Sequence, residues 1–326
     1  MQQTRLLVVG SAAGGGFPQW NCNCQNCQAV RQNDPRYQVR TQSSVAWSRD
    51  GQQWLLLNAS PDILVQIQRC QPLQPKSGSR DTGIAAVMLM DAQIDHVTGL
   101  LMLREHGQAL PLYATREVFS DLSDGFALTK LLSHYCGIEQ HIVEPTETTN
   151  TADTSDTALE NPCSPCSITW PWLPDAHAQA VALQSKPPPY SAWRHQPRVG
   201  DNVGVMLVNE RTGKRLFYAP GLGHLDATIW QCLQQADVVL VDGTFWTDDE
   251  MIVQGLGKKT AQQMGHLPQS GSAGMLEALN ELPETTRKIL IHINNSNPIL
   301  NDQGPEREAL TQSGIEVAYD GMEIWF

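Results

Sequence analysis

Four polar side chains directly follow an apolar run, Ile84–Met90, that predicts a buried strand. They are Asp91, Gln93, Asp95 and His96. In α/β folds, side chains at the carboxyl end of a buried strand face the crevice where ligands bind. Because carboxylate and imidazole groups are common metal ligands, this cluster predicts a metal site. The structural alternative is that Asp95 caps a helix beginning at about Val97 and that His96 is a packed core residue.

A second set of metal-binding side chains lies near the N-terminus, where Cys22, Cys24 and Cys27 fall within six positions. Thiolates at this spacing suit tetrahedral Zn²⁺, and a closed site of this kind is structural because it leaves no coordination position open. The fourth ligand is not local and must come from elsewhere in the chain. A redox pair or a reactive thiol is the alternative interpretation.

Three histidines in the second half are further candidates. His292 ends a predicted strand, Lys288–Ile293, and is followed by amides instead of core residues. His266 lies in a Gly/Pro loop, where a catalytic or substrate-orienting role competes with a structural one. His224 is a candidate for the cleft, while the nearby Asp226 is a candidate helix cap.

The elements that must position these residues repeat in two similar halves. Each half contains a predicted hairpin, at 44–57 and at 203–219, followed by buried strands and helices, among them a helix at 97–105. The chain closes with a predicted hairpin across Asp320 and Gly321. Two such halves indicate two sheets packed face to face with helices outside, an α/β fold of the four-layer αββα sandwich type. We expect one domain spanning residues 1–326.

One segment interrupts this pattern. Residues 144–167 are rich in Thr, Asp and Pro and nearly free of large apolar side chains, which predicts a mobile surface insert. It contains Cys163 and Cys166 in a Cys-x-x-Cys motif. A redox or metal role for this pair is disfavoured because the strand-to-helix setting of thioredoxin-like motifs is missing.

Composition limits the partners and the compartment. The net charge of −12 and the pI near 5.1 argue against nucleic acid as a partner, since binding phosphate backbones requires clustered Lys and Arg. No apolar run approaches the roughly 18 residues that span a membrane, so no membrane partner is expected. The eight cysteines do not form a secreted disulfide pattern, and the N-terminus resembles a first strand more than a signal peptide. We therefore expect a cytoplasmic protein.

Several motifs together resemble the pyrroloquinoline quinone (PQQ) biosynthesis protein B family of the metallo-β-lactamase superfamily. The polar cluster has the spacing of the superfamily motif His-x-His-x-Asp-His. The resemblance rests on the glycine-rich start, CNCQNC, NASPDI, DAQIDH, MGHLPQSG and HINNSNP, in this order. It covers nearly the whole chain apart from residues 144–167, and it implies the αββα fold of that superfamily.

The resemblance also implies which metal positions survive. Asp91 and Gln93 replace the two histidines of the first metal position, and no bridging aspartate occurs between Phe217 and Gly223, so a metallo-hydrolase with two metals is disfavoured. What remains is one carboxylate and two imidazoles, the ligand set of non-haem Fe(II) oxygenases. These ligands are Asp95, His96 and His292. We expect Asp91 and Gln93 to lie near the metal and to bond its water or the substrate.

The family implies a small-molecule or short-peptide-derived substrate and O₂-dependent hydroxylation of the tyrosine ring in a cross-linked Glu–Tyr precursor. It also implies other PQQ pathway enzymes as partners. The alternative is a non-catalytic carrier that aids the transport of PQQ or its precursor towards the periplasm. For the cysteine cluster, a related cyclic phosphodiesterase of phosphonate breakdown completes its zinc site with a histidine three residues beyond the last active-site histidine. Asn295 stands at that position here and is a possible fourth ligand.

Overall fold

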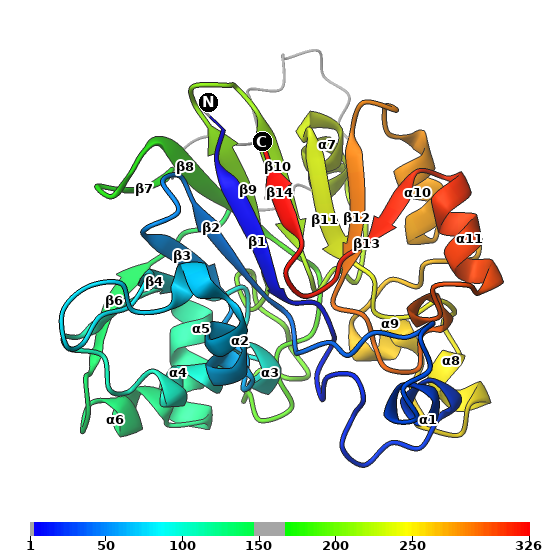
Figure 1. The fold of residues 1–326 in the computed structure, drawn as a ribbon, viewed down its shortest axis with the longest axis horizontal. Coiled ribbons are helices and arrows are strands. Elements are labelled where there is room, and N and C mark those ends of the chain that lie inside the picture. The colour runs from blue at the N-terminus through cyan, green and yellow to red at the C-terminus, as the bar shows by residue number, and fades with distance from the viewer. Residues whose placement is uncertain (1–2, 147–166) are drawn as a thin grey trace.

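Two seven-stranded sheets form the centre of the computed structural model, which describes residues 3–146 and 167–326 (Figure 1). The strand order of the first sheet is β14 (Glu323–Trp325), β1 (Arg5–Gly10), β2 (Ser44–Ser48), β3 (Trp54–Leu57), β4 (Ile84–Met88), β5 (Leu110–Ala114) and β6 (Ile138–Ile142). The order of the second sheet is β13 (Ile315–Val317), β12 (Arg287–Ile291), β11 (Val238–Asp242), β10 (Arg215–Ala219), β9 (Val203–Asn209), β8 (Leu173–Ala182) and β7 (Ile168–Trp170). The two predicted hairpins are confirmed, because β2 pairs antiparallel with β3 and β9 with β10.

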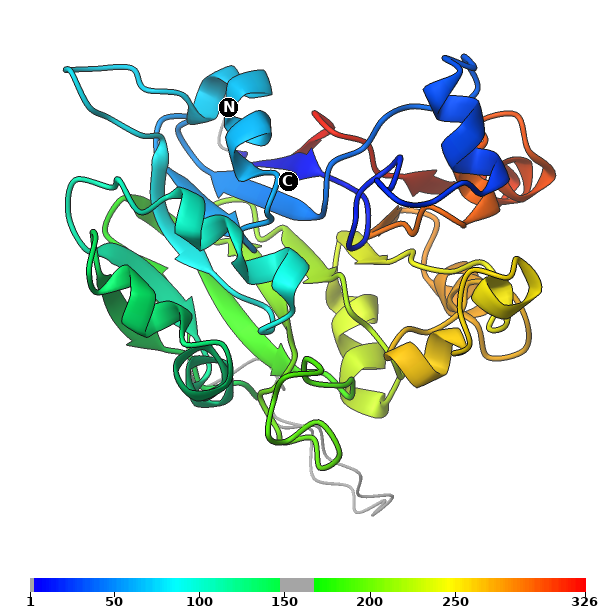
Figure 2. The ribbon, with the colours of Figure 1, turned by 90° about the horizontal axis from the view of Figure 1, so that it is seen from below.

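Helices cover the outer side of each sheet (Figures 1 and 2). Beside the first sheet lie α2 (Ile63–Arg69), α3 (Ile94–Val97), α4 (Gly99–Met102), α5 (Arg116–Ser120) and α6 (Leu128–Leu132). Beside the second lie α7 (Ala227–Gln235), α10 (Met275–Glu281) and α11 (Pro305–Gln312). Three short helices stand near the lower end of the sheets in Figure 1: α1 (Gln25–Arg31), α8 (Glu250–Val253) and α9 (Ala261–Met264).

Alternating apolar side chains explain the layers. In β1, Leu6 and Val8 join the core between the sheets, whereas Leu7 and Val9 pack on the helix side. The second sheet repeats this arrangement, since Leu240 of β11 faces the core between the sheets and Val239 packs among the helices. The predicted αββα sandwich is confirmed.

The end of the chain departs from its predicted hairpin. β13 pairs with β12 in the second sheet, whereas β14 pairs with β1 in the first, so the segment between them crosses from one sheet to the other. Asp320 fixes the crossing, because its carboxylate accepts hydrogen bonds from the backbone and hydroxyl groups of Ser11 and of Thr41. The prediction of a hairpin across Asp320 and Gly321 is wrong for this reason.

The helix predicted at 97–105 is also different in the structure. It begins three residues earlier and is divided into α3 and α4. At the break, the backbone N–H of Gly99 donates to the carbonyl of Ala59 at 2.9 Å. Asp95 lies inside α3, whose N-cap is Gln93, so Asp95 does not cap this helix.

Residues 147–166, which include Cys163, Cys166 and most of the predicted insert, lie outside the described residues. Within the part of the chain that is described, no helix is long and apolar enough to span a membrane.

Candidate metal centres

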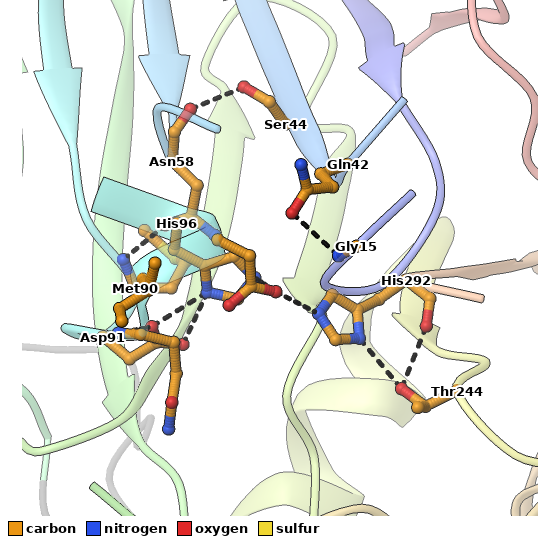
Figure 3. A network of polar contacts seen from close by, with 12 residues as sticks. Gly15, Gln42, Ser44, Asn58, Met90, Asp91, His96, Thr244 and His292 are labelled. Carbon is orange, nitrogen blue, oxygen red and sulfur yellow. Dashed lines mark hydrogen bonds and ion pairs between the residues drawn. The ribbon is translucent and has the colours of Figure 1, made fainter. Parts of the chain in front are cut away.

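Asp95, His96 and His292 converge at the carboxyl ends of the strands. α3 carries the first two residues and the end of β12 carries the third, and their ligand atoms lie within 4.8 Å of one another. Asp95 Oδ2 is 3.7 Å from His96 Nε2 and 3.4 Å from His292 Nε2. The His96 and His292 rings meet edge to face with centroids 5.2 Å apart, and Asp91 contacts the first ring while Thr244 contacts the second (Figure 3). The structure thus brings together the three residues predicted to bind one metal.

The surroundings of His96 fit a metal ligand. Its Nδ1 lies 2.8 Å from both carboxylate oxygens of Asp91, so an Nδ1–H donated there leaves a lone pair on Nε2. Nε2 is buried and has no hydrogen-bond partner among the described residues, and the side chain is only 2% exposed. A buried polar atom normally finds a partner, so a metal ion between Nε2 and Asp95 would satisfy it.

Asp91 lies in the wall of the cleft, close to the candidate ligands as expected. It was expected to bond metal-bound water or substrate, but it is buried and its carboxylate oxygens contact the His96 ring. Gln93 lines the cleft, and its side-chain amide donates to the backbone carbonyl of Lys186 at 3.1 Å. We interpret Asp91 as the group that orients His96; a bond from Asp91 or Gln93 to metal-bound water or substrate stays a prediction.

His292 is held by its backbone and by a hydroxyl. It has a left-handed φ of 61°, an unusual conformation for a residue with a side chain. Its Nδ1 lies 2.9 Å from Thr244 Oγ1, and that hydroxyl is 2.6 Å from Asp242 Oδ1. If the Thr244 hydroxyl donates to Asp242, it accepts the Nδ1–H of His292 and directs Nε2 towards Asp95.

Asp242 is a site residue that the sequence interpretation missed. It ends the buried strand β11, and its Oδ2 lies 2.6 Å from His266 Nδ1. Asp242, His266 and His292 also have ligand atoms within 4.8 Å of one another. The carboxylate already accepts the backbone N–H groups of Leu222 and Thr244, so we interpret it as the group that orients His266. The available signal was the sequence VVLVDG, an aspartate directly after an apolar run.

The charges in the cleft are strongly coupled. Burial opposes ionisation of Asp95, but the neighbouring His96 and His292 outweigh it and hold the pKa of that carboxyl well below its usual range. Burial likewise opposes protonation of His96, yet Asp91 and Asp95 raise its pKa to about 9. A cation is therefore stabilised at this position, by a proton or by a metal ion.

The cleft around these groups has a volume of about 310 Å³. Its walls include Ala13 and Gly14 of the glycine-rich loop, and a Cβ atom on Gly14 would lie 3.0 Å from Asp95 Oδ2. Two cationic residues, Arg194 and Lys259, also line it. The glycine-rich loop that follows β1 thus forms part of the cleft wall.

His224 does not join this group. Its side chain is exposed and lines a separate hollow together with Leu225 and Trp230. The predicted cap is confirmed next to it, because Asp226 accepts the backbone N–H of Ile229 at the start of α7. The expectation that His224 faces the cleft is corrected: the backbone of Gly223 packs closely against that of Gly265, and the chain then turns into α7.

The cysteine cluster forms a compact second centre. The sulfur atoms of Cys22, Cys24 and Cys27 lie within 4.8 Å of one another. The Asn295 side-chain amide covers all three, with its nitrogen 3.0 Å from the Cys22 sulfur. A hydrogen bond from the Cys27 thiol lowers the pKa of Cys24 to about 5. Three sulfur ligands with an amide above them fit a tetrahedral zinc site, in which the Asn295 oxygen would complete the set after rotation of the amide.

One short segment contacts both centres. His292 belongs to the cleft, Asn294 lines it, and Asn295 covers the cysteines. Asn26 lies next to Cys27 in α1, and its side-chain amide donates to the backbone carbonyls of Asn295 and Asn297, each at 3.0 Å. The two centres are thus joined by residues 292–297.

Comparisons with known proteins agree with this architecture. Residues 53–293 match the model of the beta-lactamase superfamily domain. The chain is 54% identical over 321 residues to the coenzyme PQQ synthesis protein B of Cupriavidus necator, covering 98% of this chain and 99% of the relative. It is 51% identical over 320 residues to the protein of the same name from Azoarcus sp., with 98% and 99% covered.

Solved structures show the same relationship. The Zn²⁺-bound PqqB from Methylobacterium extorquens has a TM-score of 0.82 and 35% identity, covering 98% of this chain and 99% of that chain. A diphosphatase from the PhnP family, with a TM-score of 0.65 and 18% identity over 99% of this chain and 97% of that chain, shares the fold. The chain belongs to the coenzyme PQQ synthesis protein B family, within the β-lactamase superfamily.

Proposed function

We propose that the protein acts in coenzyme PQQ biosynthesis as a non-haem Fe(II) hydroxylase of the tyrosine ring in a cross-linked Glu–Tyr precursor. The observation that carries this proposal is the set of one carboxylate and two imidazoles around the unpartnered His96 Nε2. This ligand set leaves coordination positions open for O₂ and substrate. The names of the relatives support the pathway.

Different residues of the chain would bind the metal and orient its ligands. Asp95, His96 and His292 would hold Fe(II), which, when bound, supplies the activation of O₂. One oxygen atom of O₂ would enter the ring as a hydroxyl group, and the other would leave as water after uptake of two electrons from an external reductant and two protons. Asp91 and Thr244 keep the two imidazoles in the orientation that binding requires.

His266 is the proposed proton-transfer residue. Burial opposes its protonation, but Asp242 outweighs this and raises the pKa of His266, so the ring holds a proton beside the substrate space. Its ring stacks on that of His292 with centroids 5.3 Å apart, which places it next to the metal ligands. A positioned acid or base of this kind contributes about 10²- to 10⁴-fold to the rate.

The test uses the full-length protein loaded anaerobically with Fe(II). We expect O₂ uptake with the precursor and a product that carries one additional oxygen atom, traced by mass spectrometry with isotopically labelled O₂. His292→Ala should abolish both and lose the cleft metal while keeping the zinc of the cysteine cluster. His266→Ala should retain the metal but slow turnover by about 10²- to 10⁴-fold.

His224→Ala is the matched control, because His224 lies outside the cleft and should leave turnover unchanged. Binding of the precursor without O₂ uptake would contradict the hydroxylase proposal and favour the carrier. A hydrolase is the second candidate, since Asp242, His266 and His292 could hold another metal. Two metals in the cleft and hydrolysis of a phosphodiester would favour it.

A further inference from the structure

A hollow lined by positive charge opens beside the candidate metal cleft. Its volume is about 410 Å³, and its lining consists of Lys186, Arg194, His195, Pro197, Lys259 and Gln263. None of these lining residues is acidic. This is unusual for a chain with a net charge of −12, in which acidic side chains outnumber basic ones by 34 to 22.

The charges in this hollow are not neutralised. Arg194 donates to the carbonyl oxygen of Pro187, and the Lys186 ammonium donates to the carbonyl of Gln263 at 2.7 Å. A carbonyl oxygen satisfies a hydrogen bond but leaves the charge in place. Within the described residues, no carboxylate lies within 4.0 Å of the Lys186, Arg194 or Lys259 cation, whereas the nearby Arg198 pairs with Asp201 at 2.8 Å.

The hollow and the cleft share two lining residues. Arg194 and Lys259 line both spaces, so their cationic groups stand at the boundary between them. The loop that carries Lys186 is tied to the metal-binding strand end, because the Gln93 amide donates to the Lys186 carbonyl. A ligand in the cleft therefore lies beside the cationic side chains of the hollow.

We propose that Lys186, Arg194 and Lys259 bind the carboxylates of an acidic substrate whose reacting ring occupies the metal cleft. The substrate class rests on the function proposed above; the presence of the anion site rests on the charges and the geometry. The planar arginine side chain binds a carboxylate through two parallel hydrogen bonds. A cationic patch in a negatively charged protein also concentrates anions at the entrance of the site.

The test measures binding, which does not depend on iron, O₂ or turnover. Calorimetry of the full-length, zinc-loaded protein with the tricarboxylate PQQ should give an affinity that falls steeply as salt is added. Arg194→Gln and Lys259→Gln should each weaken binding by about tenfold, the loss typical of one charge-assisted contact, and flatten the salt dependence. Lys258→Gln is the matched control, because the neighbouring lysine is exposed and does not line the hollow.

The outcomes separate this site from the hydroxylase proposal. If hydroxylation fails but Arg194→Gln still weakens PQQ binding relative to Lys258→Gln, the carboxylate site stands. If Arg194→Gln and Lys259→Gln both bind PQQ as tightly as the unaltered protein, the assignment is overturned. It is also overturned if the unaltered protein does not bind PQQ. Tighter binding of inorganic diphosphate than of PQQ would also overturn it, because the site would then recognise phosphoryl groups.

Discussion

Each imidazole of the candidate cleft contacts a polar group through its Nδ1 atom, and this contact determines the orientation of the ring. Asp91 contacts His96, Asp242 contacts His266 and Thr244 contacts His292. The resemblance placed Asp91 at the position of a superfamily histidine, but it did not predict that the carboxylate turns towards His96. Spacing along the chain identifies which residues meet at a strand end, whereas the direction of a side chain depends on its neighbours in space.

Asp91→Asn should weaken metal binding in the cleft by about tenfold to a hundredfold, because groups that orient a metal-bound histidine have effects of this size. The amide keeps the shape of the side chain but removes the charge that supports the basicity of His96. Competition with a coloured chelator would measure the affinity. Asp121→Asn alters a buried aspartate outside the cleft and should bind metal normally. Equal affinities of the two variants would contradict this role of Asp91.

Glu250 should make stability depend on pH. Burial raises its pKa to about 7, although Ser296 and the Trp246 backbone donate to its carboxylate. Between the ordinary pKa near 4.5 and this value, the folded protein holds a proton that the unfolded chain has released. The free energy of unfolding should therefore fall as pH rises through this window, by up to about 1.4 kcal/mol per pH unit.

Urea unfolding at a series of pH values would measure this slope. Glu250→Gln should remove this pH dependence of the free energy of unfolding. Substitution of the exposed Glu281 by Gln should leave the pH dependence unchanged. The same slope in all three proteins would show that Glu250 does not titrate as its burial requires.

At the scale of elements, the strands with continuous apolar residues were predictable and the others were not. β4 and β12 are nearly fully buried and were recognised from sequence. β8 was missed because its inward positions include four alanines, at 176, 178, 180 and 182, which give a weak hydrophobic signal. The crossing from β13 to β14 could not be predicted, because it depends on the long-range hydrogen bonds of Asp320.

The break between α3 and α4 requires a glycine. A Cβ atom at Gly99 would lie 2.2 Å from the Ser60 carbonyl oxygen and 2.7 Å from that of Ala59, and backbone atoms cannot move aside easily. Gly99→Ala should therefore lower the free energy of unfolding by about 3 kcal/mol, as overpacking does. It should also weaken metal binding, because α3 carries Asp95 and His96.

Denaturant unfolding and metal titration would measure the two effects. Gly107→Ala is the matched control, since a Cβ atom there meets nothing within 4 Å and stability should change little. If Gly99→Ala were as stable as that control, the close backbone approach would not control the path of the chain.

At the scale of the molecule, the cysteine cluster joins segments that are distant in sequence. It lies next to α1 near the N-terminus, but Asn295 and the carbonyls held by Asn26 come from the far end of the chain. The sequence predicted the three sulfur ligands, and the resemblance suggested Asn295 as the fourth. Which residues surround the cluster follows from the packing of both sheets and not from local spacing.

Cys24→Ala should lose one tightly bound zinc and a large part of the stability, because metal binding and folding are coupled. Elemental analysis and the melting temperature would measure both quantities. Cys70→Ala removes a thiol outside the cluster and should keep the zinc. Unchanged zinc content and melting temperature in Cys24→Ala would contradict a structural zinc site.

The segment 292–297 touches both centres, so metals bound at the two centres would depend on each other thermodynamically. Zinc bound by the cysteines would favour the arrangement in which Asn295 covers them, and the same arrangement sets the position of His292 three residues earlier. By linkage, a ligand that stabilises one end of this segment strengthens binding at the other end by the same factor. We therefore expect metallation to be cooperative: protein made under zinc starvation should fill its cleft poorly even when iron is abundant.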